Sequence, residues 1–299
     1  MNRILIDLTI LTDDEQKKAG YGIKLFKQKK ENTELILVGK IDNLLTLDSF
    51  QGITIINYKD KEEALEFCFA QVKEKKCDAI VSFRDRLEIA AASNKFLIQK
   101  EPSPLYVTSY ANAYTGKWTL LGDFGYQTNP SESDYLNYLT ERKTILLKFN
   151  GRKNPAARFL LPSGLSRDES ITSVIRERKK DKSYKGEIES LHRLEADSDI
   201  LIGNPNLVCA TISGIEQGIT IYNEYLEQGR NASIQYKMGG ALIKKLRQKF
   251  ESSIDKKFTS GGRLLYGFDK PVVIIRKDTA AGGINACLNL ADNAANSLK

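Results

Sequence analysis

KEEALEFCFAQVKEKKCDAIVSF, residues Lys61 to Phe83, carries the pattern on which the prediction of the fold depends. Its first half has apolar residues at a spacing near 3.6, which is typical of an amphipathic helix. These residues are Ala64, Leu65, Phe67, Cys68 and Val72. Its second half, CDAIVSF, is a short run rich in apolar and β-branched residues, which is typical of a buried strand. The stretch therefore predicts a helix followed by a strand.

The same alternation continues in both directions along the chain. Other short apolar runs predict strands, among them RILIDLTI, ELILVGK, ITIINY, LYVTSY, WTLLGDF, KTILLKF, ARFLLPSG, SDILIGNPN and PVVIIRK. Polar helical segments lie between several of them, for example LEIAAASNKFLIQK. Buried strands separated by helices favour an α/β fold with a doubly wound, mostly parallel sheet and helices on both faces. Without a repeat or a low-complexity linker, we expect a single domain, 1–299.

The composition excludes several kinds of catalysis. The chain has 299 residues and one histidine, His192, so a site with two histidine ligands cannot form within it. A Ser-His-Asp triad would have to use His192, which lies in the polar segment EIESLHRLE. The four cysteines form no CxxC pair, which argues against a zinc site. We expect no metal and no cofactor. With no export signal, reduced cysteines and a cytoplasmic location are expected.

Polar or small residues end the predicted strands. In a parallel sheet these carboxyl ends share one edge, where ligands bind. The residues at these ends are Asp7, Gly39, Ser82, Asp123, Ser163, Asn204 and Arg276. Asp123 lies between two glycines in WTLLGDFGYQTNP (Trp118–Pro130), where a ligand could approach the backbone closely. The alternative is that Asp123 only caps the following helix.

Several of these segments, taken in order, resemble the phosphate acyltransferase family of bacterial phospholipid synthesis, often called PlsX. The family's first strand ends in Asp, as Ile4–Asp7 does, and its second reads ELILVG, as Glu34–Gly39 does. Its DVGAN loop is similar to the segment LLGDFGYQTNP, Leu120–Pro130. Its closing segment is similar to Gly261–Ile274. The resemblance covers nearly the whole chain, and it implies a fold like that of the isocitrate and isopropylmalate dehydrogenases.

The departures from the family pattern fall at positions that bear on chemistry. The family's glycine-rich SAGNTGA loop keeps Ser82, but Arg84, Asp85 and Leu87 replace its later glycines and Asn. The family Asp in a D-G-F turn is replaced by Asn204. The sequence therefore resembles the family in its strands and helices but differs from it at the residues of the expected active site.

The resemblance implies transfer of a fatty acyl group from acyl carrier protein to inorganic phosphate, giving an acyl phosphate for phospholipid synthesis. Such a site must hold an anion beside an electrophile and stabilise an oxyanion. We expect Asn204, Asp123 and Ser82 as catalytic residues. We expect substrate to bind to Arg84, Asp85, Gly125, Asn206 and Lys277. Because a carboxylate beside phosphate is repelled, Asp123 should pair with a cation.

Positive charge is concentrated in MGGALIKKLRQKFESSIDKK, residues 238–257, within a helical element, 230–260, that could protrude. The net charge is +7, and this segment predicts a basic amphipathic helix. It is either a solvated surface helix or a face that docks acyl carrier protein, an anionic membrane or a membrane acyltransferase. The residues expected to contact the partner are Lys244, Lys245, Arg247 and Lys249. A homodimer is implied only by the resemblance, and no base-reading module suggests nucleic acid.

Two alternatives to the acyl carrier protein reaction stay open. The first is a catalytically inactive PlsX-like protein that binds acyl chains, carrier protein or a partner enzyme, which the altered loop after Ser82 and Asn204 would explain. The second is a short-chain phosphotransacylase that uses acyl coenzyme A thioesters and belongs to the same broad fold group.

Overall fold

The structure is a computed structural model, and it describes residues 2–39, 52–58, 60–102, 104–111, 118–123, 141–144, 156–160, 184–188, 200–203 and 262–298. The chain divides into two compact units. Unit 1 comprises Met1–Thr108, Gly125–Thr128 and Thr259–Lys299, and unit 2 comprises Ser109–Phe124 and Asn129–Phe258. The single domain, 1–299, stays a prediction, and the element 230–260 lies outside the described residues.

Unit 1 contains a mixed, mostly parallel sheet. Its strands in spatial order are β3 (Ile53–Ile56), β2 (Glu34–Val38), β1 (Arg3–Asp7), β4 (Ala79–Ser82), β11 (Val272–Ile275), β10 (Gly262–Tyr266) and the first part of β5 (Leu105–Ala111), whose last three residues belong to unit 2. Neighbours from β3 to β11 pair in parallel, whereas β10 pairs antiparallel with both β11 and β5. The predicted α/β fold with a mostly parallel sheet is therefore confirmed.

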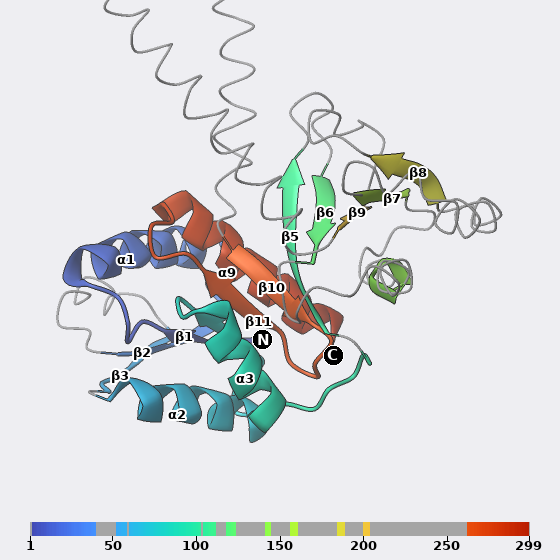
Figure 1. Cartoon of the computed structure of the whole chain (residues 1–299). Helices are drawn as coiled ribbons and strands as arrows, with labels where there is room; N and C mark the ends of the chain where they lie inside the picture. The colour runs from blue at the N-terminus through green and yellow to red at the C-terminus, as the bar shows by residue number, and fades with distance from the viewer. Residues whose placement is uncertain are drawn as a thin grey trace, which may run out of the picture. The chain divides into compact units, whose positions relative to one another are not determined.

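Helices cover both faces of this sheet (Figure 1). They are α1 (Asp13–Lys27), α2 (Lys61–Lys73), α3 (Arg86–Phe96) and α9 (Ala281–Ser297). The α1 and α9 helices pack together on one face, and α2 and α3 on the other. Because both faces are covered, all four residues of β4 and all four of β11 are buried.

Side-chain caps begin three of these helices. Thr12 and Glu15 form a capping box at α1, in which Thr12 N donates to Glu15 Oε2 at 2.8 Å. At α2, Asp60 Oδ1 accepts from the amides of Glu62 and Glu63 at 2.8 and 2.9 Å. Such caps satisfy amides that have no partner within the helix, and they fix where each helix begins beside the sheet edge.

Two glycines allow close packing in unit 1. A Cβ atom at Gly22 of α1 would lie 2.6 Å from Ile284 Cβ of α9, so the helices can approach only because Gly22 has none. Gly267 follows β10 with φ 113°, a conformation that favours glycine, and a Cβ there would lie 2.8 Å from Pro104 Cα. Gly267 thus lets the chain turn between β10 and β11.

The described part of unit 2 contains four parallel strands. Their order is β6 (Trp118–Gly122), β9 (Ile200–Ile202), β7 (Ala157–Leu160) and β8 (Tyr184–Ile188). Leu121, Ala157, Ile200 and Ile202 are fully buried. The predicted strands within the described residues are present, except that Lys143 and Thr144 of KTILLKF are helical, and the rest of that segment lies outside the described residues. The apolar pattern does not predict β8, whose YKGEI sequence is largely polar.

Candidate functional site

The carboxyl ends of β1, β4 and β11 lie side by side in unit 1. Asp7 pairs in register with Ser82, and Ser82 with Ile274, two residues before Arg276. The Ser82 hydroxyl donates to Asp7 Oδ2 at 3.2 Å, and both side chains are fully buried. The predicted meeting of Asp7, Ser82 and Arg276 at one sheet edge is therefore confirmed for unit 1.

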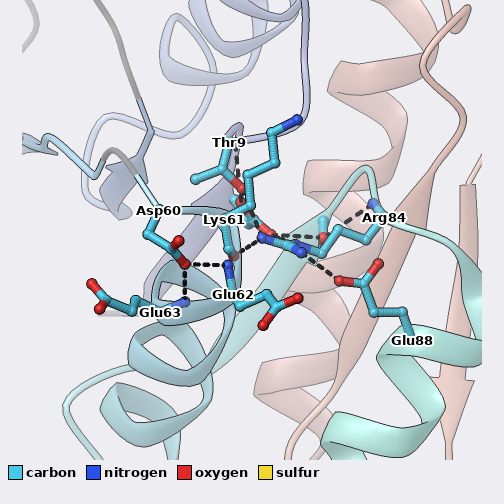
Figure 2. A network of polar contacts seen from close by, with 9 residues as sticks. Thr9, Asp60, Lys61, Glu62, Glu63, Arg84 and Glu88 are labelled. Carbon is cyan, nitrogen blue, oxygen red and sulfur yellow. Dashed lines mark hydrogen bonds and ion pairs between the residues drawn. The ribbon is translucent and has the colours of Figure 1, made fainter.

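Arg84 lies at the centre of a polar network on this edge (Figure 2). Its Nε donates to Asp7 Oδ2 at 2.6 Å, and its Nη2 donates to Thr9 Oγ1 at 2.9 Å. Its Nη2 also donates to the carbonyl of Lys61, and its Nη1 pairs with Glu88 Oε1. Burial opposes the charge, but Asp7 and then Glu88 outweigh it, so the pKa of the Arg84 guanidinium lies above its ordinary value.

A cavity of about 680 Å³ opens beside this network. Small-molecule sites have volumes of roughly 300–1,000 Å³, so the cavity has the size of such a site. Its lining residues come from the loops and strand ends of unit 1: Ile10, Phe83, Arg84, Asp85, Arg86, Glu88, Arg263, Ile274, Ile275, Arg276 and Lys277. Five of them are basic and two are acidic, so the cavity favours an anion.

Both acidic residues of the cavity have partners in the protein. Asp85 caps α3, where its Oδ1 accepts from the amide of Leu87 at 2.8 Å. Glu88 pairs with Arg84. Just after β11, Arg276 donates to both oxygens of Asp278, at 3.0 and 2.6 Å. Hydrogen bonding from Arg276 holds the pKa of the Asp278 carboxyl below its usual value.

The predicted site residues of unit 1 thus lie together at one sheet edge. Their side chains differ in burial and in the groups that they contact. Ser82 is buried against Asp7, Asp85 caps a helix, and Arg84 is held by protein acceptors. Lys277 is exposed and lines the cavity. Their roles in catalysis or substrate binding stay predictions.

Asp123 directly follows β6 in unit 2 and is fully buried. Its Oδ2 accepts from Arg142 Nε at 3.4 Å, and the Arg142 side chain is also fully buried. The backbone is fixed as well, since Asp123 N donates to Gly203 O at 3.2 Å. Asp123 therefore pairs with a cation, as the Coulomb argument predicts. Its catalytic role stays a prediction.

Other predicted site residues lie outside the described residues. These are Asn204, Gly125 and Asn206, together with Lys244, Lys245, Arg247 and Lys249 of the segment 238–257. Ser82 belongs to unit 1 and Asp123 to unit 2, and the contacts of each residue are given for its own unit. The predicted meeting of Ser82, Asp123 and Asn204 thus stays a prediction.

Sequence reasoning did not identify Glu88, Arg263 or Arg142 as residues of these sites. Glu88 lies four residues after Arg84 and pairs with it, but Arg84 precedes α3, so helical spacing alone does not predict the pair. Arg142 belongs to an ordinary charged segment, ERK, and nothing in its neighbours distinguishes it from a surface residue.

Within the described ranges, no helix is both long and apolar enough to cross a membrane. Those same ranges contain no group of three or more His, Cys, Asp or Glu residues placed to hold a metal ion. Three of the four cysteines are described, and Cys68, Cys77 and Cys287 are free and buried, as expected for reduced thiols.

The fold is similar to that of solved phosphotransacylases. The branched-chain phosphotransacylase of Enterococcus faecalis V583 superposes with a TM-score of 0.60 at 14% identity, covering 99% of each chain. A phosphotransacetylase from Streptococcus pyogenes gives 0.55 at 14% identity, covering 99% of this chain and 94% of the other. The EutD phosphotransacetylase from Staphylococcus aureus gives 0.55 at 11% identity, covering 100% of this chain and 94% of the other.

At this level of identity, the similarity concerns the fold alone. No family model matches the chain, and the search of curated proteins finds no match. The chain is therefore an α/β protein with the phosphotransacylase type of fold and a basic cavity at the carboxyl edge of its sheet.

Proposed function

We propose that the protein is a phosphotransacylase, which transfers a short acyl group between a coenzyme A thioester and inorganic phosphate. The observation that carries the proposal is the basic cavity at the carboxyl ends of β4 and β11. The similarity of fold to phosphotransacylases over the full length of the chain supports it. The fold of the isocitrate dehydrogenase type, which the PlsX resemblance implies, remains part of the proposal.

The reaction needs no nucleophile from the protein. A phosphate oxygen attacks the thioester carbonyl, the new C–O bond forms and the C–S bond breaks. The thiolate leaves and takes up the proton that the phosphate hydroxyl loses, so the products are an acyl phosphate and a thiol. The protein has to hold the phosphate and to stabilise the charge that develops on the carbonyl oxygen. Arg276 and Lys277, on the β11 side of the cavity, are suited to the first task because they add positive charge.

The proposal is tested by incubating the protein with phosphate and with acetyl, butyryl or isovaleryl coenzyme A. The acyl phosphate is trapped with hydroxylamine and measured as the hydroxamate. We expect product only when phosphate is present. Lys277→Ala should lower kcat/KM about tenfold, because a charged group near the anion is lost. The matched control is Lys95→Ala, whose side chain pairs with Glu66 at 2.6 Å on the exposed surface and should retain activity.

Acyl carrier protein is the second candidate for the acyl donor. The ordered PlsX-like segments favour it, including the strand that ends in Asp7. In that reaction, the basic segment 238–257 would dock the acidic carrier or an anionic membrane, and the protein would act as a homodimer in the cytoplasm. Product from acyl carrier protein thioesters but not from coenzyme A thioesters would select this candidate. Binding of either thioester without product would instead select the catalytically inactive alternative.

A further inference from the structure

Arg84 is a buried guanidinium, although it lines the cavity. Its side chain is 3% exposed, and its nitrogens donate to four protein acceptors. Two of these acceptors are the carboxylates of Asp7 and Glu88. Because two negative charges surround one positive charge, Arg84 adds little net attraction for a bound anion. The net positive charge of the cavity comes instead from its other basic residues.

The acceptors of Arg84 belong to separate segments of unit 1. Asp7 ends β1, Thr9 lies in the loop after it, Lys61 begins α2, and Glu88 lies in the first turn of α3. A single side chain therefore joins three segments at the carboxyl edge of the sheet (Figure 2). Thr9 is further fixed to Asp7, because Thr9 N donates to Asp7 Oδ1 at 3.0 Å.

Two of the segments joined by Arg84, the loop after β1 and the start of α3, also contribute lining residues to the cavity. Ile10 directly follows Thr9, and Phe83, Asp85 and Arg86 flank Arg84 itself. Displacement of the loop after β1 or of the start of α3 would move these lining residues. The shape of the cavity therefore depends on the Arg84 contacts, even though the guanidinium faces the protein.

We propose that Arg84 is a positioning residue, which sets the geometry of the anion-binding cavity by joining the β1 loop to α2 and α3. It does so without contacting the bound anion. This function requires the planar fork of a guanidinium, which reaches several acceptors in fixed directions, whereas the ammonium of lysine is a point charge. The inference rests on the proposed function only in taking the cavity as the phosphate site.

The experiment measures the affinity of the full chain for inorganic phosphate by calorimetry, alongside the acyl transfer assay. The variants are Arg84→Ala, Arg84→Lys and Thr9→Val, with Arg3→Ala as the control. Arg3 is a matched arginine, since its Nε pairs with Glu34 at 2.5 Å, but its side chain is 46% exposed and it is not among the residues that line the cavity. Thr9→Val removes an acceptor of Arg84 without changing any charge.

We expect Arg84→Ala and Arg84→Lys to weaken phosphate binding about tenfold, since small displacements of binding groups have effects of this size or more. Thr9→Val should weaken it in the same direction. Guanidinium chloride below denaturing concentrations should restore part of the affinity of Arg84→Ala, by occupying the vacated place beside Asp7. Arg3→Ala should bind phosphate as the unmodified protein does, with no response to guanidinium.

The inference is overturned if Arg84→Lys binds phosphate as well as the unmodified protein, because charge alone would then suffice. It is also overturned if Thr9→Val is without effect, or if the unmodified protein binds no phosphate. Should Arg84→Ala fail to fold, Arg84→Lys and Thr9→Val carry the test. Arg84-dependent phosphate binding without acyl phosphate formation would reject the proposed function and leave the positioning role intact.

Discussion

The carboxylate of Asp7 and the guanidinium of Arg84 form a buried ion pair, with Nε 2.6 Å from Oδ2 and side chains that are 0% and 3% exposed. The two residues are 77 positions apart, yet the parallel pairing of β1 with β4 brings them together. An ion pair of this kind holds two charges away from water. Loss of the Asp7 charge removes one buried ionic partner of Arg84 and leaves Glu88 as the other.

Asp7→Asn should therefore destabilise unit 1. We expect a loss of about 1–3 kcal/mol in the free energy of unfolding, measured in urea, because the buried Arg84 Nε loses its charged acceptor while Glu88 remains paired with the guanidinium. The control is Glu34→Gln, which breaks the exposed pair of Arg3 with Glu34 and should cost about 0–1 kcal/mol. Equal losses in the two variants would contradict the structural assignment.

Asp123 and Arg142 should show energetic coupling in unit 2. Asp123→Asn and Arg142→Gln each remove one charge from a pair whose side chains are both fully buried. Each change alone should cost several kcal/mol, and the double variant should cost clearly less than their sum. A double-mutant cycle of urea unfolding measures this coupling. Additive losses would mean that the two groups do not interact.

Asp278 should compete with a bound anion for Arg276, because its carboxylate accepts two hydrogen bonds from that guanidinium. Asp278→Asn removes the competing charge, so phosphate should bind several-fold more tightly in calorimetry. Asp14→Asn, at an exposed aspartate paired with Lys17, is the control and should leave the affinity unchanged. Weaker phosphate binding in Asp278→Asn would show that Arg276 needs Asp278 for its orientation.

Asp292 should make stability depend on pH in acid. Burial raises the pKa of its carboxyl, but hydrogen bonds from Asn2, Lys30 and Thr33 outweigh this, so the pKa lies below its ordinary value. A carboxyl with a depressed pKa stabilises the fold above its unfolded pKa, near 4, and loses this contribution as pH falls through the folded pKa. Urea unfolding of Asp292→Asn should therefore vary less with pH below about pH 4 than that of the unmodified protein.

Gly262→Ala should destabilise the packing of β10 against α9. The added Cβ atom would lie 2.2 Å from Cys287 Sγ, and crowding of this kind costs about 1–3 kcal/mol. Cys287→Ala in the same chain removes the sulfur and should restore part of the lost stability. Thermal unfolding of the two single variants and the double variant tests this. If the double variant is no more stable than Gly262→Ala, the destabilisation does not come from crowding against the Cys287 sulfur.

The strand ends of unit 1 were predictable because apolar runs with covered faces are distinctive in sequence. The positions of Asp7, Ser82 and Arg276 at one edge follow from parallel pairing alone. The direction of β10 did not follow from the sequence, because an apolar run carries no sign of its orientation in the sheet. Only the turn at Gly267 returns the chain so that β10 and β11 are antiparallel.

The inward orientation of Arg84 was also beyond the sequence. Arg84, Arg86 and Lys277 are all basic residues next to strand ends, and the pattern treats them alike. What separates them is a carboxylate contributed by a different strand, Asp7, and the carbonyl of Lys61 at the start of α2. Such pairings depend on three-dimensional proximity. From sequence alone, a substrate-binding role for Arg84 was therefore as plausible as a positioning role.

The middle of the sheet in unit 1 is completed only by the far end of the chain, since β4 is flanked on one side by β11. During synthesis, residues 262–298 leave the ribosome after all of unit 2 has been made. Until then the open side of β4 offers unpaired backbone groups, a template for wrong pairing with other chains. The nascent protein should therefore depend on chaperones, and shortening it before β11 should yield aggregates.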